Sequence, residues 1–152
     1  MTGNERRTQE EDALLLERQL CFPLYAAARQ VTGAYAPYLK PLGLTYTQYL
    51  VMLVLWEEDG VTVGQICERL HLDSGTLTPL LKKLEAQGLV VRRRSGRDER
   101  KVLIALTPQG KEKKKDALGV PAAVGSCLAL EPQEASALYR LLYKLLGKEE
   151  GS

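Results

Sequence analysis

The 152-residue sequence lacks any long apolar segment. Its longest unbroken run of apolar side chains, Leu50 to Trp56, has seven residues, whereas a membrane-spanning helix needs roughly 20. The N-terminal segment MTGNERRTQEEDALLLERQL is too acidic for a signal peptide and lacks the apolar stretch and the small-residue cleavage site. We therefore expect a cytoplasmic protein that does not bind a membrane.

The sequence also lacks the residue patterns of metal sites and of common enzymes. Cys21, Cys67 and Cys127 are odd in number and form no CxxC pair, which excludes a disulfide scaffold and gives no zinc-site spacing. A P-loop, a GxSxG motif and an HExxH motif are all missing. We expect no metal, no cofactor and no enzyme activity.

The charge of the chain is unevenly distributed. With 45% hydrophobic and 26% charged residues, the composition is that of one globular domain. Between Lys82 and Lys115, twelve lysines and arginines face four acids, whereas the rest of the chain has nine basic and fifteen acidic residues. This basic segment favours a nucleic-acid partner, although a solvated strand and helix would show the same charges.

The N-terminal part of the sequence predicts helices. We expect residues 1–10 to be a flexible tail. From Asp12 to Gly33 apolar residues recur at helical spacing, and Pro23 predicts a kink or a short break in this helix. The apolar residues of the stripe are Leu16, Leu20, Leu24, Ala28 and Val31. A short element over residues 36–42 follows.

The middle of the chain predicts a helix-turn-helix. Thr47 is placed to cap a helix from Gln48 to about Glu58, and the apolar residues all round this helix predict a buried central position. Two shorter helices are expected over residues 63–70 and about 75–87. The link between them, residues 71–73, has the length typical of a helix-turn-helix.

A β-hairpin and further helices are expected behind this pair. Residues 89–107 combine β-branched stretches, LVVRRR and KVLIALT, with the turn-like SGRDER between them, which predicts a hairpin with a charged tip. Thr107 and Pro108 open a helix that runs from about Gln109 toward Cys127, with Gly119 and Pro121 disturbing it. A last helix covers about 132–146. The expected fold class is mostly α with a small β-hairpin wing, a winged helix-turn-helix between N- and C-terminal helices.

The residue types of the second helix and of the wing suit DNA. Hydroxyl groups near a helix N-terminus can contact phosphates and base edges in the major groove, and a basic hairpin tip can reach phosphates or the minor groove. Asp98 can hold one arginine in place by a bidentate pair. The candidate DNA-binding residues are Ser74, Thr76, Thr78, Pro79, Lys82, Lys83, Arg93, Arg94, Arg97, Asp98 and Arg100. Solvated charges, ordinary helix caps and a winged helix used only for protein contacts are the alternatives.

The run DSGTLTPLLKKLEAQGLVVRRRSGRDERKVLIALTPQGK resembles the winged-helix core of the MarR family of bacterial transcription regulators. Asp98, Arg100, Leu106 and Thr107 match the element D-x-R-x-x-x-x-x-L-T that is specific for it. The resemblance implies a homodimeric repressor that binds a pseudo-palindromic, double-stranded DNA operator. It also implies a single domain over residues 11–152, with a winged-helix lobe over about 45–107 and dimerisation helices over about 11–44 and 108–148.

Within that family, residues 20–25 are similar to the sensing-cysteine segment of organic hydroperoxide resistance regulators of the OhrR type. Cys21 corresponds to the reactive cysteine, and Tyr35 and Tyr46 match the tyrosines that hydrogen-bond its sulfur. Cys127 matches the resolving cysteine of the subclass that forms an intersubunit disulfide. Without that match, a small-molecule thiol would complete the switch, as in the single-cysteine subclass.

The chemistry of a peroxide sensor explains these residue types. A thiolate attacks the peroxide oxygen, and the resulting sulfenic acid can condense with a second thiol. Amide groups of a helix that restarts at Pro23 would favour negative charge on Cys21, and the Tyr35 and Tyr46 hydroxyls could donate hydrogen bonds to it. A buried core position is the alternative for Cys21 and the preferred interpretation of Cys67.

The sequence thus predicts a DNA-binding repressor that leaves its operator when an organic hydroperoxide oxidises Cys21, followed by an intersubunit disulfide with Cys127. Two alternatives remain open. A repressor of the same fold could be released by a small hydrophobic or phenolic ligand and would not need Cys21. A thiol peroxidase is disfavoured because no basic residue is clearly placed beside Cys21 and the wing would have no purpose.

Overall fold

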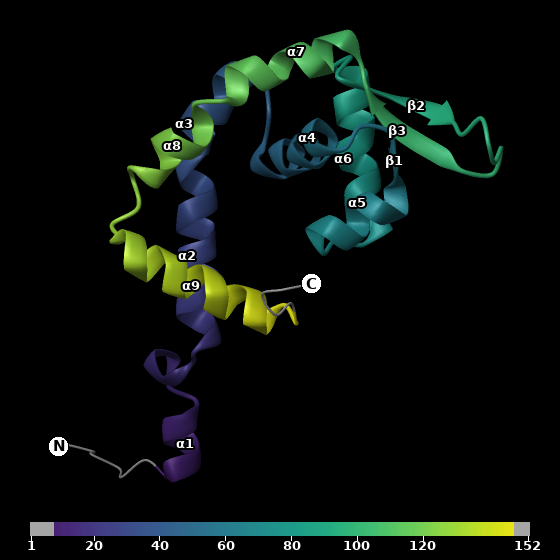
Figure 1. Cartoon of the computed structure of the whole chain (residues 1–152). Helices are drawn as coiled ribbons and strands as arrows, with labels where there is room; N and C mark the ends of the chain where they lie inside the picture. Colours follow the sequence, from purple (N-terminus) through teal and green to yellow (C-terminus); the bar gives the residue numbers. More distant parts are fainter. Residues whose placement is uncertain (1–7, 148–152) are drawn as a thin grey trace. The chain divides into compact units, whose positions relative to one another are not determined.

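The structure, a computed structural model, describes residues 8–147. It divides into two compact units, Met1–Val120 and Pro121–Ser152. The elements of the first unit are α1 (Gln9–Ala13), η1 (Leu16–Arg18), α2 (Cys21–Ala34), α3 (Ala36–Leu39), η2 (Lys40–Leu42), α4 (Tyr46–Glu57), β1 (Val61–Thr62), α5 (Val63–Leu70), α6 (Ser74–Ala86), β2 (Val90–Arg94), β3 (Val102–Leu106) and α7 (Pro108–Ala117). α8 (Val120–Gly125) and α9 (Pro132–Leu145) follow (Figure 1). No helix in the described part of the chain is long and apolar enough to cross a membrane.

The N-terminal helix is broken upstream of the position that the sequence predicts. Instead of one helix kinked at Pro23, α1 ends at Ala13 and α2 begins at Cys21, with a short 3-10 turn between them. Pro23 is the third residue of α2, where its missing N–H costs little because the first N–H groups of a helix have no partner within it. The Gln19 side chain donates to the Ala13 carbonyl at 2.5 Å, satisfying a group left open by the break.

The start of the chain overlaps only partly with the tail that we expected. Thr8 caps α1 in a reciprocal pair with Glu11, whose carboxylate accepts from the Thr8 N–H. Residues 8–10 therefore belong to a capped helix or its cap. Residues 1–7 lie outside the described part of the chain.

The central helix α4 is buried as expected, but Thr45 and not Thr47 is its cap. Thr45 Oγ1 accepts from the Gln48 N–H at 3.3 Å, and the Gln48 side chain accepts from the Thr45 N–H at 2.9 Å. Only Thr45 has a glutamine three residues later, whereas the corresponding residue for Thr47 is Leu50, which cannot return the bond. The prediction of Thr47 was therefore wrong, and the helix begins two residues earlier.

The helix-turn-helix is confirmed in α5 and α6. The Asp73 carboxylate caps α6 by accepting from the Thr76 N–H at 2.7 Å. His71 reverses the chain between the helices in the left-handed region, with φ of 53°. Leu77, Leu81 and Leu84 are buried along one side of α6, so its opposite side is left for contacts outside the lobe.

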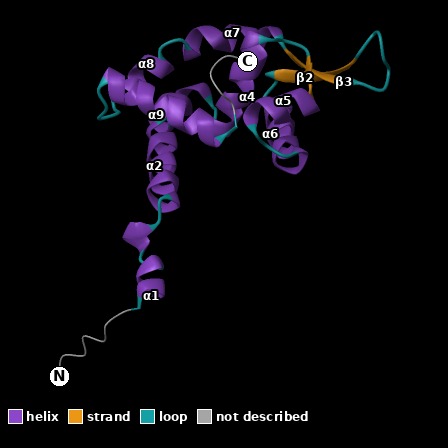
Figure 2. Ribbon diagram, turned by 60° about the horizontal axis from the view of Figure 1, so that its bottom comes forward, coloured by secondary structure: helices purple, strands orange, loops and turns teal. Residues whose placement is uncertain are grey.

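The wing is a three-stranded antiparallel sheet in the order β1-β3-β2. The predicted hairpin of β2 and β3 is confirmed, with Val90 opposite Leu106 and Arg94 opposite Val102. The sequence did not indicate β1, which is only two residues long and pairs Val61 with Ile104. In Figure 2 the two longer strands extend past α5 and α6 to a loop at their tip.

The helix predicted to run toward Cys127, with a disturbance at Gly119 and Pro121, is two helices with Gly119 between them. Thr107 caps α7 as expected, accepting from the Gly110 N–H at 3.0 Å, but α7 ends at Ala117 and α8 ends at Gly125. Cys127 therefore follows a helix and is not part of one. The last helix is confirmed as α9, and none of its residues is buried.

Candidate functional site

Cys21 is the first residue of α2 and carries an exposed, free thiol. The sequence predicted that a helix restarts at Pro23. In the structure this helix begins two residues earlier, at Cys21 itself. Unpaired amide N–H groups at such an end favour negative charge nearby. The alternative of a buried core cysteine is excluded for the single chain, since Cys21 is exposed.

Tyr35 and Tyr46 form the pair that the sequence singled out. Tyr35 follows α2 and Tyr46 begins α4, and their ring centroids lie 4.8 Å apart. Burial, and in second place the nearby Tyr35, raise the pKa of Tyr46. A raised phenol pKa keeps the hydroxyl protonated, which is the form that can donate a hydrogen bond to a thiolate.

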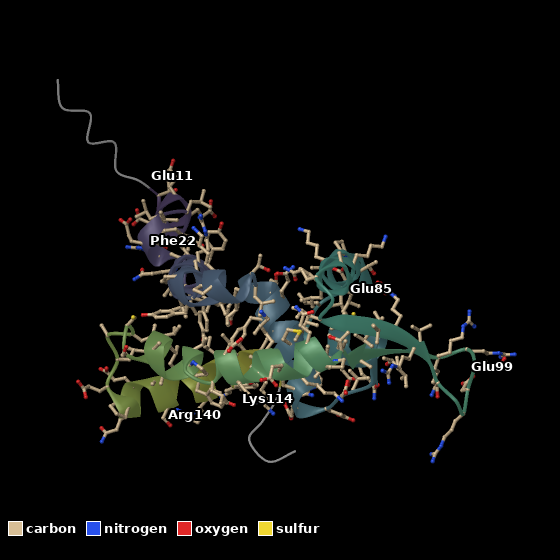
Figure 3. The ribbon with its side chains drawn as sticks, turned by 90° about the horizontal axis from the view of Figure 1, so that it is seen from above. Glu11, Phe22, Glu85, Glu99, Lys114 and Arg140 are labelled. Carbon is tan, nitrogen blue, oxygen red and sulfur yellow. The ribbon has the colours of Figure 1, made fainter. Side chains whose placement is uncertain are left out.

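The same structure separates this tyrosine pair from Cys21 of its own chain. Cys21 is the first of the 14 residues of α2 and Tyr35 directly follows the last. A helix rises 1.5 Å per residue, so about 20 Å lies between them. In the N-terminal unit α1 and the start of α2 lie away from α4, α5 and α6 (Figure 1), and Phe22 marks this end in Figure 3. The expected hydrogen bonds to the sulfur therefore cannot form within one chain.

The other two cysteines lie on different elements. Cys127 is exposed, follows α8 and donates from its thiol to the Ala123 carbonyl at 3.4 Å. It belongs to the second unit, whereas Cys21 belongs to the first. Cys67 lies on α5 and is half-buried, less enclosed than the core position expected for it. The disulfide between Cys21 and Cys127 stays a prediction.

Most of the predicted contacts on the recognition helix α6 face solvent. Ser74, Thr76, Pro79, Lys82 and Lys83 are exposed. Thr78 is half-buried, and its hydroxyl donates to the Ser74 carbonyl at 2.7 Å. Toward DNA this hydroxyl can therefore act only as a hydrogen-bond acceptor. Thr76, Pro79, Lys82 and Lys83 lie on the side of α6 opposite its three buried leucines, as a groove-binding helix requires, and Ser74 is the first residue of the helix.

The wing presents its arginines to solvent near Glu99, which marks the tip in Figure 3. Arg93, Arg97 and Arg100 are exposed, and the exposed Arg94 donates to the Glu99 carbonyl at 3.3 Å. These arginines belong to the β2–β3 hairpin, and strand β2 of this hairpin packs against α6. One lobe thus carries both predicted DNA-binding elements.

Asp98 has a different role from the one that we expected. Its carboxylate accepts from the Arg100 backbone N–H at 3.0 Å, and its carbonyl accepts from the Lys101 N–H at 3.0 Å. None of the ion pairs found in the described residues involves Asp98. The predicted bidentate pair with an arginine side chain is therefore wrong, and Asp98 closes the turn of the wing through the backbone.

Tyr49 is a third phenol that sequence reasoning missed. Its ring centroid lies 5.8 Å from that of Tyr35, and burial, then Tyr35 and Tyr46, raise its pKa. Tyr49 follows Tyr46 by three residues on α4, a spacing that places both on one face of the helix. That spacing was visible in the sequence, but the approach of Tyr35 was not.

This geometry defines a class of protein: a winged-helix DNA-binding regulator. Residues 34–117 match the family described as transcriptional regulator SarA/Rot, and the chain belongs to this family. It is 49% identical over 138 residues to the organic hydroperoxide resistance transcriptional regulator of Bacillus subtilis (strain 168), covering 89% of this chain and 92% of the relative.

Solved structures give the same result. Overoxidised AbfR bound to DNA has a TM-score of 0.72 and 39% identity, covering 91% of this chain and 97% of that one. Disulfide-formed AbfR has a TM-score of 0.61 and 40% identity, covering 90% and 96%; AbfR is a protein of Staphylococcus epidermidis. MarR from E. coli has a TM-score of 0.68 and 27% identity, covering 84% and 97%. The predicted family, fold class and function class, a redox-responsive transcription regulator, are confirmed by these comparisons.

Proposed function

We propose that this protein is a homodimeric repressor that binds its operator in the reduced state and leaves it when an organic hydroperoxide oxidises Cys21. The observation that carries the proposal is the exposed Cys21 thiol at the start of α2, together with the Tyr35–Tyr46 pair, whose ring centroids lie 4.8 Å apart. The same chain carries a winged-helix lobe with exposed DNA-binding candidates. The name of the Bacillus subtilis relative and the redox states of AbfR support the same assignment.

The exposed apolar faces of α2 and α9 support a dimer. α2 has no buried residue, and Phe22 and Leu24 are each 43% exposed on it. α9 exposes Leu138 and Leu145 in the same way. Apolar faces of this kind in a soluble regulator are typical of protein interfaces, and a second copy is the partner that supplies matching faces by two-fold symmetry.

A dimer also explains how the tyrosines could reach a Cys21 sulfur, although the length of α2 separates them within one chain. If two α2 helices lie antiparallel, the end of one helix faces the start of the other. Tyr35 and Tyr46 of one copy would then donate to the Cys21 sulfur of the second copy. Each sensing site would contain both chains, so that a change at the sulfur acts directly on the dimer.

The reaction proceeds in two balanced steps. The Cys21 thiolate attacks the outer peroxide oxygen, the O–O bond breaks, and a proton converts the departing alkoxide to an alcohol, leaving a sulfenic acid. A thiol then attacks that sulfur and water leaves, forming a disulfide. Cys127 of the second copy is the proposed thiol, and a low-molecular-weight thiol is the substitute. Reduction of this disulfide by an external thiol would return the protein to its DNA-binding state.

DNA recognition follows from the exposed residues of the lobe. Ser74, Thr76, Thr78, Pro79, Lys82 and Lys83 of α6 would face the major groove, and Arg93, Arg94, Arg97 and Arg100 of the wing would face phosphates or the minor groove, with Asp98 shaping the turn. Two lobes on a pseudo-palindromic operator must keep the half-site spacing. A disulfide that shifts them breaks simultaneous contact and loses the avidity. Such a protein acts on DNA in the cytoplasm.

Operator binding before and after one equivalent of cumene hydroperoxide tests the proposal. The DNA is a duplex selected by the reduced protein from a random-sequence pool. Oxidation should release the wild type, whereas Cys21→Ser should bind as tightly as the wild type and stay bound. Cys67→Ser, the matched control, should release normally. Release of Cys21→Ser by peroxide would contradict the proposal and favour a ligand-operated repressor.

A further inference from the structure

Four aromatic rings form a continuous line through the N-terminal unit, in the order Tyr46, Tyr35, Tyr49 and Trp56. The Tyr35 centroid lies 4.8 Å from that of Tyr46 and 5.8 Å from that of Tyr49, and Tyr49 lies 6.3 Å from Trp56. Tyr46, Tyr49 and Trp56 share one face of α4, because spacings of three and seven residues are close to whole helical turns. Tyr49 is 3% exposed and joins the two ends of the line.

The far end of this line is fixed to α7. Trp56 Nε1 donates to the Gly110 carbonyl at 2.9 Å, and Gly110 lies in the first turn of α7. From the next turn, Lys114 Nζ donates to the Trp56 carbonyl at 3.1 Å (Figure 3 labels Lys114). Trp56 is therefore bound to α7 through both its side chain and its backbone.

Gly110 also contacts the segment that leaves the recognition helix. A Cβ added at Gly110 would overlap the Leu89 carbonyl oxygen, so the two backbones touch. The Thr107 hydroxyl donates to the Gly88 carbonyl at 2.6 Å and accepts from the Gly110 N–H at 3.0 Å. These four residues, Gly88, Leu89, Thr107 and Gly110, form a wing junction where the end of α6, the end of β3 and the start of α7 meet.

We propose that Tyr49 and Trp56 are positioning residues that transmit a displacement of the Tyr35–Tyr46 pair to the wing junction, and so change the placement of the recognition helix and wing. The inference rests on the proposed function, since it needs oxidation of Cys21 to displace the tyrosines. Aromatic rings have few rotatable bonds, and close-packed interiors transmit displacement because they contain little free space. Coupling between distant sites travels through packed side chains and hydrogen bonds of this kind.

Ordinary core packing is the competing explanation for Tyr49 and Trp56. In that case their substitution would lower stability without changing the response to peroxide. Val54 provides a matched control, because it is a buried residue of α4, 4% exposed, and takes no part in the aromatic line. Val54→Ala removes core volume from the same helix and leaves every ring in place.

The first experiment measures the ratio of operator Kd after and before oxidation. The probe is the duplex selected from a random pool, the oxidant is cumene hydroperoxide, and Cys21 oxidation is counted by mass spectrometry. Trp56→Phe keeps a ring and removes the N–H that binds Gly110. It should bind DNA normally when reduced and oxidise at Cys21 normally. Its ratio of Kd after oxidation to Kd before oxidation should be about tenfold smaller than that of the wild type, which is within the usual range of coupling between sites. Val54→Ala should keep the wild-type ratio.

The second experiment uses the fluorescence of Trp56, the single tryptophan of the chain. In the protein without DNA, oxidation of Cys21 should shift Trp56 emission. Tyr49→Leu, which interrupts the line, should abolish the shift, while Val54→Ala should retain it. Thermal unfolding of each variant establishes that it is folded at the temperature used.

The outcomes separate the two proposals. A wild type that oxidises at Cys21 and stays on DNA overturns the proposed function and this inference with it. A wild type that is released, with an unchanged Kd ratio in Trp56→Phe, overturns this inference alone. An equal loss in Val54→Ala overturns it as well, because general loss of packing would then explain the effect.

Discussion

Asp59 and Leu106 are joined by a hydrogen bond, in which Asp59 Oδ1 accepts from the Leu106 N–H at 2.8 Å across 47 positions of sequence. Leu106 is the last residue of β3, where the wing returns to the lobe. The other carboxylate oxygen of Asp59 lies 3.5 Å from Lys111 Nζ of α7. Asp59 therefore ties the loop after α4 to the base of the wing and to the helix that follows it.

Asp59→Ala should lower the free energy of unfolding by about 1–3 kcal/mol, because it leaves the N–H of buried Leu106 without its acceptor. Lys111→Ala is the matched control, since it removes only an exposed ion pair and should cost about 0–1 kcal/mol. Urea unfolding at pH 7 measures both. Equal effects would show that the ion pair, and not the hydrogen bond, holds the wing.

Gly110→Ala should prevent folding or destabilise the protein by more than about 4 kcal/mol, because the added Cβ would overlap the Leu89 carbonyl oxygen and a backbone must move. Gly64 offers the comparison: it lies in α5, and a Cβ there would meet only the Thr62 hydroxyl at 3.9 Å. Gly64→Ala should be neutral or stabilise by up to about 1 kcal/mol. Circular dichroism during heating distinguishes the two, and a well-folded Gly110→Ala protein would contradict the contact.

Arg97→Ala and Arg100→Ala should each weaken operator binding and reduce its dependence on salt. If each arginine neutralises one phosphate, the slope of log K against log salt should fall by about 0.9 per substitution. Lys115→Ala on α7, where Lys115 pairs with Glu112, should leave the slope unchanged. Titrations of the selected duplex at several salt concentrations supply the slopes. Unchanged slopes for both wing variants would place the wing off the DNA.

Cys127→Ser should still form the sulfenic acid at Cys21 but not the intersubunit disulfide. After one equivalent of cumene hydroperoxide, the wild type should run as a dimer on a non-reducing gel and Cys127→Ser as a monomer, with the sulfenic acid trapped by a dimedone reagent. Cys67→Ser should behave as the wild type. A dimer band that survives in Cys127→Ser would exclude Cys127 as the resolving thiol.

Much of the DNA-binding lobe was predictable because its signals are local. The short link before α6 and the Thr107–Pro108 start of α7 each involve residues within one helical turn, and the structure has both. The cap of α4 was missed although its signal is equally local. Thr45 and Thr47 both precede the apolar run, and only the partner at Gln48 separates them.

Local signals predicted the helix-turn-helix and the basic hairpin, since caps, turns and alternation depend on neighbours along the chain. The peroxide-sensing residues are a prediction from the family resemblance. How distant parts of the chain meet is visible only in the folded protein. It paired Val61 with Ile104 in a strand too short to carry a pattern, and bound Trp56 to Gly110. It also put the length of α2 between Cys21 and Tyr35. These relations depend on packing between elements far apart in sequence, which no local pattern records.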